Sequence, residues 1–546
     1  MKKYILILIC FVSYLPSLFS QQDKDNTKPL ELPAFIIEGV EQLNIRSGMK
    51  QAPAKPMPLD VKDLDSLNTY DKQAPALLEV DELPTHYVTK KFSKGFIKGI
   101  YGLFNTPSIE GAYQFDLANF DIYAKSGFEH SSGDAQYSDY NKFFIDINSD
   151  YIADDKFFIF GGSRTHTGLL FNTKSYNLYG FNKDHKYYID KSSDYFDRNA
   201  TQFKLNIASE GTYENALFNV GANINISKFT NDKLIRQYTI SDAFSHNYLR
   251  GYIDIKNYWK NFLIGGNILL NFENLDANSI NFYQAVGTVS YFNKDISTIA
   301  KVGFQFADNS QNNNRAGLLI EGNLEYRIDK SLTLKLNLNS GLEKTEFEEI
   351  VQYNPYMSNR TFIDYTYNIL KLDGAIWFHP TTKLSITGGA ELRLADRLLN
   401  YELDSLAEFT LTYYSGSIFN IFGECFYAIS SIDKIIGNIH INLNSLESDK
   451  HLTYTPLLKL STTYARKWFE KLTTNVSLEY NGQRYTSTSD NDIVNGYFML
   501  NVSADYKINK FTINLTLNNL TNSTIYIWDK YRERSLFASL GLMWQF

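Results

Sequence analysis

Cysteine and long apolar runs are both scarce in this chain, and each scarcity excludes a class of structure. The 546 residues contain two cysteines, Cys10 and Cys425, and Cys10 falls in an apolar stretch at the N-terminus. If that stretch is removed, the single cysteine left forms no intramolecular disulfide. Elsewhere no run of about 18 apolar residues occurs, which excludes membrane-spanning helices. If the chain enters a membrane, it does so as a closed barrel of strands.

Motifs of catalysis and of cofactor binding are also missing. The eight histidines are scattered, and we find no metal-binding histidine pair, no nucleophile elbow, no P-loop and no dinucleotide fingerprint. We therefore predict that the protein is not an enzyme, and we expect no cofactor, no metal and no catalytic residue.

The formal net charge of −7 argues against nucleic acid as a partner. Cys425 lies beside Glu424 and Phe426, so we predict a small apolar wall residue, since reactive thiols need electropositive surroundings.

The first twenty residues have the pattern of a processing signal. Lys2 and Lys3 precede the apolar run YILILICFVSYL, and a cleavage point follows near Ser20. The run is too short for a spanning helix and is typical of a secretory signal peptide. We predict that residues 1–20 are a signal peptide.

The prolines divide the rest of the chain into two parts. Seven prolines fall between Pro29 and Pro84, and only four fall in the whole remainder. Proline cannot donate a hydrogen bond to a strand ladder. We therefore predict a Pro-rich N-terminal segment over residues 21–93, which forms a tail or a small irregular domain. Residues 94–546 are free to form a sheet.

Apolar and polar residues alternate over segments of about ten residues from Lys94 onward. Residues 332–338 carry leucine at every second position, and residues 218–226 and 511–517 repeat the pattern. Each such strand has an apolar face and a face rich in Asn, Thr, Ser and Gly. A soluble β-sandwich or propeller is the alternative, but its strands are typically about five or six residues long. A tilted strand that crosses a bilayer needs about 9–11 residues, which fits better.

The connections alternate between short and long. Ten short turns, from Ala118–Phe120 to Lys507–Lys510, alternate along the chain with longer polar loops. The first connection, near Thr106, is the exception, because it is short where a longer loop would be expected. Together with eleven other loops they join about 22 strands, a count good to about two. We therefore predict an all-β fold, a transmembrane antiparallel β-barrel, with both termini at the short-turn end. Short periplasmic turns and long outer loops are typical of an outer-membrane barrel.

One long loop is strongly acidic. Residues 343–353, EKTEFEEIVQY, contain four glutamates. A cation or a basic ligand would suit them, but we expect a solvated loop.

The C-terminal stretch carries a more specific pattern. An Asn519-Leu520 pair ends one strand, a loop with Tyr526 follows, and Arg534 introduces a last strand that ends on Trp544-Gln-Phe546. This tail resembles the last hairpin of TonB-dependent outer-membrane receptors. The resemblance implies a 22-strand barrel in the cell outer membrane of a Gram-negative envelope, an outward-facing closing strand, and Trp544 and Phe546 as the signal read by the barrel-assembly machinery.

The resemblance does not extend to the N-terminus. Receptors of this family have a plug about twice as long as residues 21–90, and its Gly- and Arg-bearing pattern is absent here. Within LPAFIIEGVEQLNI, the residues Phe35, Ile36, Ile37 and Glu38 resemble the box that pairs with a TonB-type energy transducer. An edge strand or a short hairpin explains this stretch equally well.

Three functions remain open from the sequence. The first is a receptor-like transporter that takes up a nutrient or chelate, with residues 21–93 as a reduced plug and transducer contact. The second is a passive, porin-like channel in which residues 21–93 are a periplasmic tail. The third is a structural or docking barrel that binds a partner protein. The expected partners are outer-membrane lipid, the assembly machinery, the energy transducer and a small ligand whose identity the sequence does not give.

Overall fold

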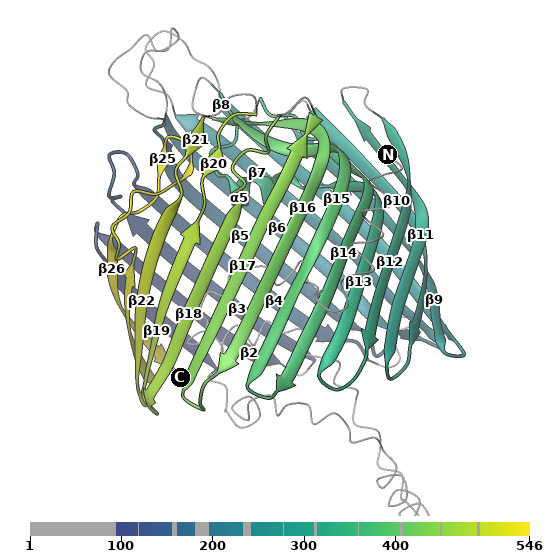
Figure 1. Cartoon of the computed structure of the whole chain (residues 1–546), viewed down its shortest axis with the longest axis horizontal. Coiled ribbons are helices and arrows are strands. Elements are labelled where there is room, and N and C mark those ends of the chain that lie inside the picture. The colour runs from purple at the N-terminus through teal and green to yellow at the C-terminus, as the bar shows by residue number, and fades with distance from the viewer. Residues whose placement is uncertain are drawn as a thin grey trace, which may run out of the picture.

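The computed structural model describes residues 94–117, 119–154, 161–180, 196–232, 242–276, 278–310, 314–358, 360–404, 408–447, 450–488 and 492–546. Residues 1–93 lie outside the described residues, and with them the predicted signal peptide and the Pro-rich segment. The described chain forms one closed wall of tilted antiparallel strands (Figure 1).

The wall consists of 22 strands, each hydrogen-bonded to its neighbours in chain order. They are β1 Gly95–Gly102, β2 Thr106–Leu117, β3 Phe120–Ser131, β4 Tyr140–Ile152, β5 Arg164–Leu178, β6 Phe196–Tyr213, β7 Ala216–Asp232, β8 Asp242–Trp259, β9 Phe262–Leu275, β10 Asn278–Phe292, β11 Ile296–Asn309, β12 Arg315–Arg327, β13 Leu332–Lys344, β14 Tyr365–Thr381, β15 Leu384–Leu403, β16 Phe409–Ala428, β17 Asp433–Leu446, β18 Leu458–Phe469, β19 Leu472–Asn481, β22 Tyr497–Ile508, β23 Phe511–Asn518 and β26 Phe537–Gln545. Two small hairpins lie in the loops, β20 Arg484–Tyr485 with β21 Ile493–Val494, and β24 Tyr526–Trp528 with β25 Tyr531–Arg532.

The barrel closes where the first strand meets the last. β1 pairs with β26 from Phe96 opposite Gln545 to Gly102 opposite Ser539. Beyond this register, the Gly95 N–H donates to the Phe546 carbonyl at 3.1 Å, and the Phe546 N–H donates to the Gly95 carbonyl at 3.0 Å. Closure removes the edge strands that would otherwise pair with other chains. The predicted fold and strand count are therefore confirmed.

One of the ten predicted short turns, Ala153–Lys156, was wrong, because β4 ends at Ile152 and β5 begins only at Arg164. The arrangement is as predicted: ten connections, most of them short, lie at one end of the barrel and eleven at the other. We call these the short-turn end and the long-loop end. The expectation that only the first long-loop connection is short was wrong, because β9 ends at Leu275 and β10 begins at Asn278. Asp276 adopts a positive φ of 50° there, a conformation that Asp tolerates in tight hairpins.

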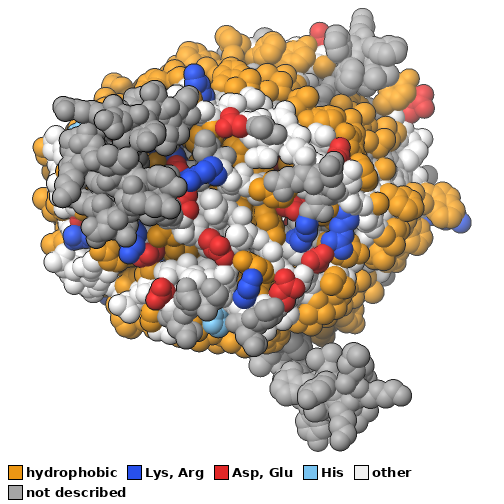
Figure 2. Space-filling model, turned by 90° about the horizontal axis from the view of Figure 1, so that it is seen from above, with side chains coloured by type: hydrophobic (Ala, Val, Ile, Leu, Met, Phe, Trp, Pro, Cys, Tyr) orange, Lys and Arg blue, Asp and Glu red, His pale blue; other side chains and the backbone are white. Residues whose placement is uncertain are grey.

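The two faces of each strand differ as the alternation predicts. In β26, Leu540, Leu542 and Trp544 are exposed on the outer face, with Leu540 at 59%, whereas Ser539 and Met543 face inward and are buried. The same pattern continues around the wall, and hydrophobic side chains gather along much of the rim seen from above (Figure 2). A continuous apolar outer surface of this extent is stable when hydrocarbon covers it.

The height of the wall varies around the barrel. β15 and β16 have 20 residues each, whereas β1 and β23 have 8 and β26 has 9. The long strands extend past the span that a bilayer needs, which is about 9–11 residues. Their extensions build the long-loop end, where the candidate site lies.

The seam gives a first prediction. A Cβ on Gly102 would lie 2.4 Å from the Phe537 ring, whereas a Cβ on Gly99 would meet no atom within 4 Å. We expect Gly102→Val to destabilise the barrel by about 1–3 kcal/mol through overpacking, and Gly99→Val to have little effect. Urea unfolding of the protein in lipid vesicles measures both, and equal stabilities would contradict the assigned seam packing.

Candidate functional site at the long-loop end

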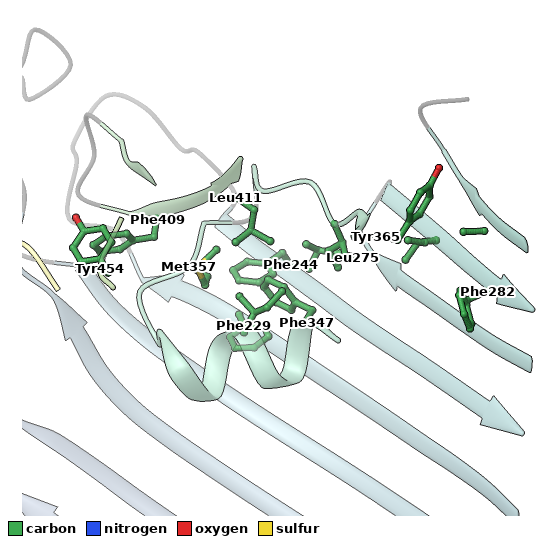
Figure 3. Packing of buried hydrophobic residues seen from close by; sticks show 14 of the residues in the cluster. Phe229, Phe244, Leu275, Phe282, Phe347, Met357, Tyr365, Phe409, Leu411 and Tyr454 are labelled. Carbon is green, nitrogen blue, oxygen red and sulfur yellow. The ribbon is translucent and has the colours of Figure 1, made fainter. Parts of the chain in front are cut away.

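The connection between β13 and β14 folds into the barrel. Its residues Phe347–Tyr353 form helix α5, in which Phe347 is 0% exposed and Ile350 is 1% exposed. Phe347 packs edge-on against Phe229 of β7 and Phe244 of β8 (Figure 3). The expectation that residues 343–353 form a solvated loop was therefore wrong. No helix of the described residues is long and apolar enough to cross a membrane.

The acidic residues of this loop meet bases on the opposite wall, which explains the inward fold. The Glu348 carboxylate lies 3.1 Å from the Lys204 ammonium and accepts a hydrogen bond from Asn225 at 2.8 Å. Glu346 lies 3.7 Å from the Arg250 guanidinium. These partners come from β6, β7 and β8. Charge compensation thus lets a segment rich in glutamate pack inside the barrel.

A fully buried carboxylate anchors the start of α5. Glu273 of β9 is 0% exposed and accepts a hydrogen bond from the Phe347 N–H at 2.8 Å. The Nε2 atom of His246 lies 2.7 Å from the same oxygen, and the Lys344 ammonium forms an ion pair with the other oxygen. Breaking a buried ion pair of this kind costs about 3–5 kcal/mol, because the remaining charge loses its partner. The network therefore fixes where α5 begins.

A buried arginine joins two further connections. Arg198 of β6 is 1% exposed, and it donates to the carbonyls of Met357 at 2.6 Å and Pro355 at 3.4 Å. Its guanidinium also lies 2.5 Å from the Glu408 carboxylate, in the connection between β15 and β16. One wall residue thus holds the main chain of the β13–β14 loop and the side chain of the next loop. Guanidinium geometry suits such multiple contacts.

Aromatic side chains from three connections and from the first residue of β16 pack together next to α5. This group, which we call the aromatic cap, consists of Tyr356, Phe409, Tyr454, Trp528 and Tyr531. The Tyr356 and Tyr531 rings stack at 3.5 Å between centroids, and Trp528 lies 5.1 Å from Phe409 and 4.8 Å from Tyr454. Burial raises the pKa of Tyr356 and Tyr531 well above the usual value, so both stay neutral. The cap narrows the long-loop end with a packed apolar core.

Two regions of the inward-facing wall are polar, and they differ in the kind of group that they carry. On β11–β13 the charges are paired, as in Lys301 with Glu321 at 2.9 Å. On β16–β22 amides and hydroxyls bond to each other, as in Asn442 to Asn420 at 2.6 Å. Such a lining can hydrogen-bond a polar solute. Among the described residues, no group of three or more His, Cys, Asp or Glu is placed to hold a metal ion.

The residues singled out from the sequence lie elsewhere. Trp544 is 42% exposed on the outer face, and its ring lies 4.8 Å from that of Phe546, which stacks on Tyr113 at the short-turn end. The box-like residues Phe35, Ile36, Ile37 and Glu38 lie outside the described residues. Cys425 is exposed on the outer face of β16, a wall position as predicted.

Sequence reasoning missed the inward loop and its anchors. Alternation places His246 and Glu273 on inward faces, but it would place Lys344 on the outer face with Leu336, and the register shift between Asn339 and Gly341 turns Lys344 inward. Nor can alternation tell which inward residues meet across the barrel. The available signal was the spacing of Phe347 and Ile350, one helical turn apart inside an acidic stretch.

Comparison with known proteins identifies the fold. No family model and no curated protein matches the sequence. The structure is similar to the FrpB iron transporter from Neisseria meningitidis, with a TM-score of 0.66 and 10% identity over 83% of this chain and 82% of that chain. It is also similar to the copper transporter OprC (TM-score 0.65, 11% identity, 83% and 80% covered). A third similar structure is the ferric enterobactin receptor PfeA from Pseudomonas aeruginosa (0.66, 8%, 83% and 81%).

These neighbours are TonB-dependent receptors, and the chain has the barrel fold of that family. Identities of about 10% show the fold and leave the substrate of this chain unassigned.

The buried ion pair gives a second prediction. We expect Lys344→Met to lower the free energy of unfolding by about 3–5 kcal/mol, because Glu273 stays buried without its cation. The double variant Lys344→Met, Glu273→Gln should recover much of the loss. The control is Lys301→Met, whose partly exposed pair should cost at most about 1 kcal/mol. Equal losses for both single variants in urea unfolding would contradict the anchoring role.

A third prediction concerns pH. Burial raises the pKa of the Glu533 carboxyl, in the last long connection, although Arg534 and Lys174 oppose the shift. Its contribution to stability is therefore present below the unfolded pKa of about 4.3 and is lost as pH rises through the folded value. We expect the stability of the wild type relative to Glu533→Gln to increase as pH falls from 7 to 4.

Asp329, in the short turn after β12, provides a control of opposite sign. The backbone N–H of Ser331 and its hydroxyl hold the pKa of this carboxyl below its usual range. This contribution is present above the unfolded pKa of about 3.9 and is lost as pH falls below it, so relative to Asp329→Asn the wild type should lose stability below about pH 4. Thermal unfolding from pH 7 down to about pH 2 compares the two pairs, and slopes of the same sign would refute the assignment.

Proposed function

We propose that the protein is an outer-membrane transporter that takes up a scarce nutrient or chelate, as a receptor of the TonB-dependent type. The observation that carries the proposal is a closed 22-strand barrel whose long-loop end is narrowed by an inward loop and the aromatic cap. A passive pore does not need a narrowed mouth, whereas a selective transporter uses one to hold its ligand and to exclude other solutes. The similar structures named as iron and copper transporters support uptake as the general activity.

The N-terminal segment would block the lumen at the short-turn end. Gly95 begins β1 at the short-turn end, so residues 21–93 join the wall at that mouth of the lumen. We propose that they act as a reduced plug, and that Phe35, Ile36, Ile37 and Glu38 contact a TonB-type energy transducer. This arrangement requires the short-turn end, and with it both termini, to face the periplasm.

The last residues would direct assembly. Phe546 is hydrogen-bonded to Gly95 through its main chain and stacks on Tyr113, so it lies at the seam between the first and the last strand. We propose that the assembly machinery reads Trp544 and Phe546 before β26 pairs with β1. The ligand is a small polar solute whose identity stays open.

Bilayer conductance tests the proposal. Three proteins are compared in a planar bilayer: residues 21–546, residues 94–546, and residues 94–546 with the segment 345–357 replaced by a short Gly-Ser linker. We expect the first to be closed and the second to show discrete open steps. The third should show larger steps, because the linker removes α5 from the lumen.

Other outcomes favour the alternatives. Wide, permanent opening of residues 21–546 would refute the plug and favour a passive channel. If none of the three proteins conducts, the lumen is blocked by the barrel's own loops and a docking role gains support. A linker variant with the same steps as residues 94–546 would show that α5 does not lie in the path.

A further inference from the structure

Lysines line one side of the lumen mouth at the short-turn end. Lys434 of β17, Lys467 of β18 and Lys507 of β22 occupy inward positions near the strand ends, on the same face as the polar lining. Lys471 lies in the turn between β18 and β19, and its carbonyl accepts a hydrogen bond from the Lys507 N–H at 2.8 Å. We call these four residues the lysine arc.

Three carboxylates lie near the arc without neutralising it. Asp433 pairs with Arg466 at 3.4 Å. Asp505 is buried and accepts a hydrogen bond from an asparagine of β23 at 2.7 Å. Glu470 is exposed in the same turn as Lys471. Basic residues therefore remain in excess at this part of the rim.

Two of the arc lysines are available to a partner. Lys467 and Lys471 are both exposed, and neither forms an ion pair with another described residue. Ammonium groups gathered on neighbouring strands create a positive potential at this side of the mouth. Like charges that face each other across a ladder also repel, and a bound polyanion removes that cost. The arc therefore suits an acidic partner.

The far side of the mouth has the reverse charge. The turn between β6 and β7 lies about halfway around the ring of strands from the arc, and Glu210 and Glu214 are exposed there. An acidic segment that enters the mouth is therefore repelled from this side and attracted to the arc.

The chain that precedes the barrel contains such a segment. Residues 60–82 hold seven acidic residues and two lysines, and the acidic run nearest the barrel consists of Glu79, Asp81 and Glu82. Five strand spacings separate β1 from β18, which is about 30 Å along a rim whose strands tilt by about 35–45°. Residues 83–94 span at most about 40 Å when extended. The acidic run therefore reaches the arc.

We propose that residues 79–82 dock on the lysine arc and hold the N-terminal segment in the mouth at the short-turn end. This inference rests on the proposed plug role, and it names the wall surface that the plug uses. The contact is electrostatic and depends on salt, because the screening length falls from about 10 Å at 0.1 M to about 3 Å at 1 M. Anionic lipid headgroups are the competing occupant.

Reversal of charge on each side tests the docking. Residues 21–546 are recorded in a planar bilayer in 0.1 M KCl as the wild type, with Lys467→Glu and Lys471→Glu, with Glu79, Asp81 and Glu82 each changed to Lys, and with all five changes combined. We expect the wild type to be closed and each partial set to raise the open probability severalfold. The combined variant should close again, because the attraction is restored with its signs exchanged.

Lysines in two other short turns provide the matched control. Lys260, between β8 and β9, and Lys294, between β10 and β11, are exposed and lie outside the arc. Lys260→Glu with Lys294→Glu should leave the wild-type closure unchanged. Correct folding of every variant is checked by its heat-modifiable migration on gels.

A disulfide locates the contact independently of conductance. In residues 21–546 with Cys425→Ser, Val80→Cys is combined either with Thr473→Cys on the inward face of β19 or with Ala208→Cys on the inward face of β6. We expect oxidation to link position 80 to position 473 severalfold more than to position 208.

The outcomes separate the docking from the plug itself. An open wild type would refute the plug, and the docking with it. A closed wild type whose reversal variants all stay closed would overturn the docking and leave the plug intact. Opening by the lysine changes alone would overturn it in favour of an anionic headgroup on the arc. Equal crosslinking to both walls, or a combined variant that stays open, would also overturn it.

Discussion

Hydrocarbon offers no partner to a backbone N–H or C=O group, and this constraint governs the structure. Each unpaired group inside a bilayer costs several kcal/mol, so every wall strand needs two neighbours. The pairing of β1 with β26 meets that need for the whole sheet, and Phe546 completes it through its main chain. The apolar outer face, the even strand count and the alternating connections all follow from this closure.

Inside the barrel a different constraint applies. Charged side chains that are buried away from bulk water need partners of opposite charge. Glu273, Glu346 and Glu348 meet a cation or a histidine on facing strands, and the β13–β14 connection folds inward as a result. Buried ion pairs contribute little net stability, but they fix the position of the loop, since a shifted loop would leave its charges without partners. Aromatic burial in the cap then adds the stabilisation that the ion pairs do not provide.

Regular features were predictable from the sequence, and contacts between distant segments were not. Alternation over residues 332–338 gave the faces of β13, and counting short turns gave 22 strands, because both depend on local periodicity. The acidic loop was misjudged because its partners are distant along the chain: Lys204 lies 144 residues before Glu348, and Arg250 lies 96 residues before Glu346. The short connection at Asp276 was missed because only its backbone conformation distinguishes it from a longer loop.

Trp528 touches Phe409 at the start of β16, Tyr454 in the β17–β18 connection and Tyr353 in the β13–β14 connection. Moving any one of these segments outward would expose aromatic surface on the others, which costs free energy. The positions of segments that are far apart in the sequence are therefore coupled through a single buried ring.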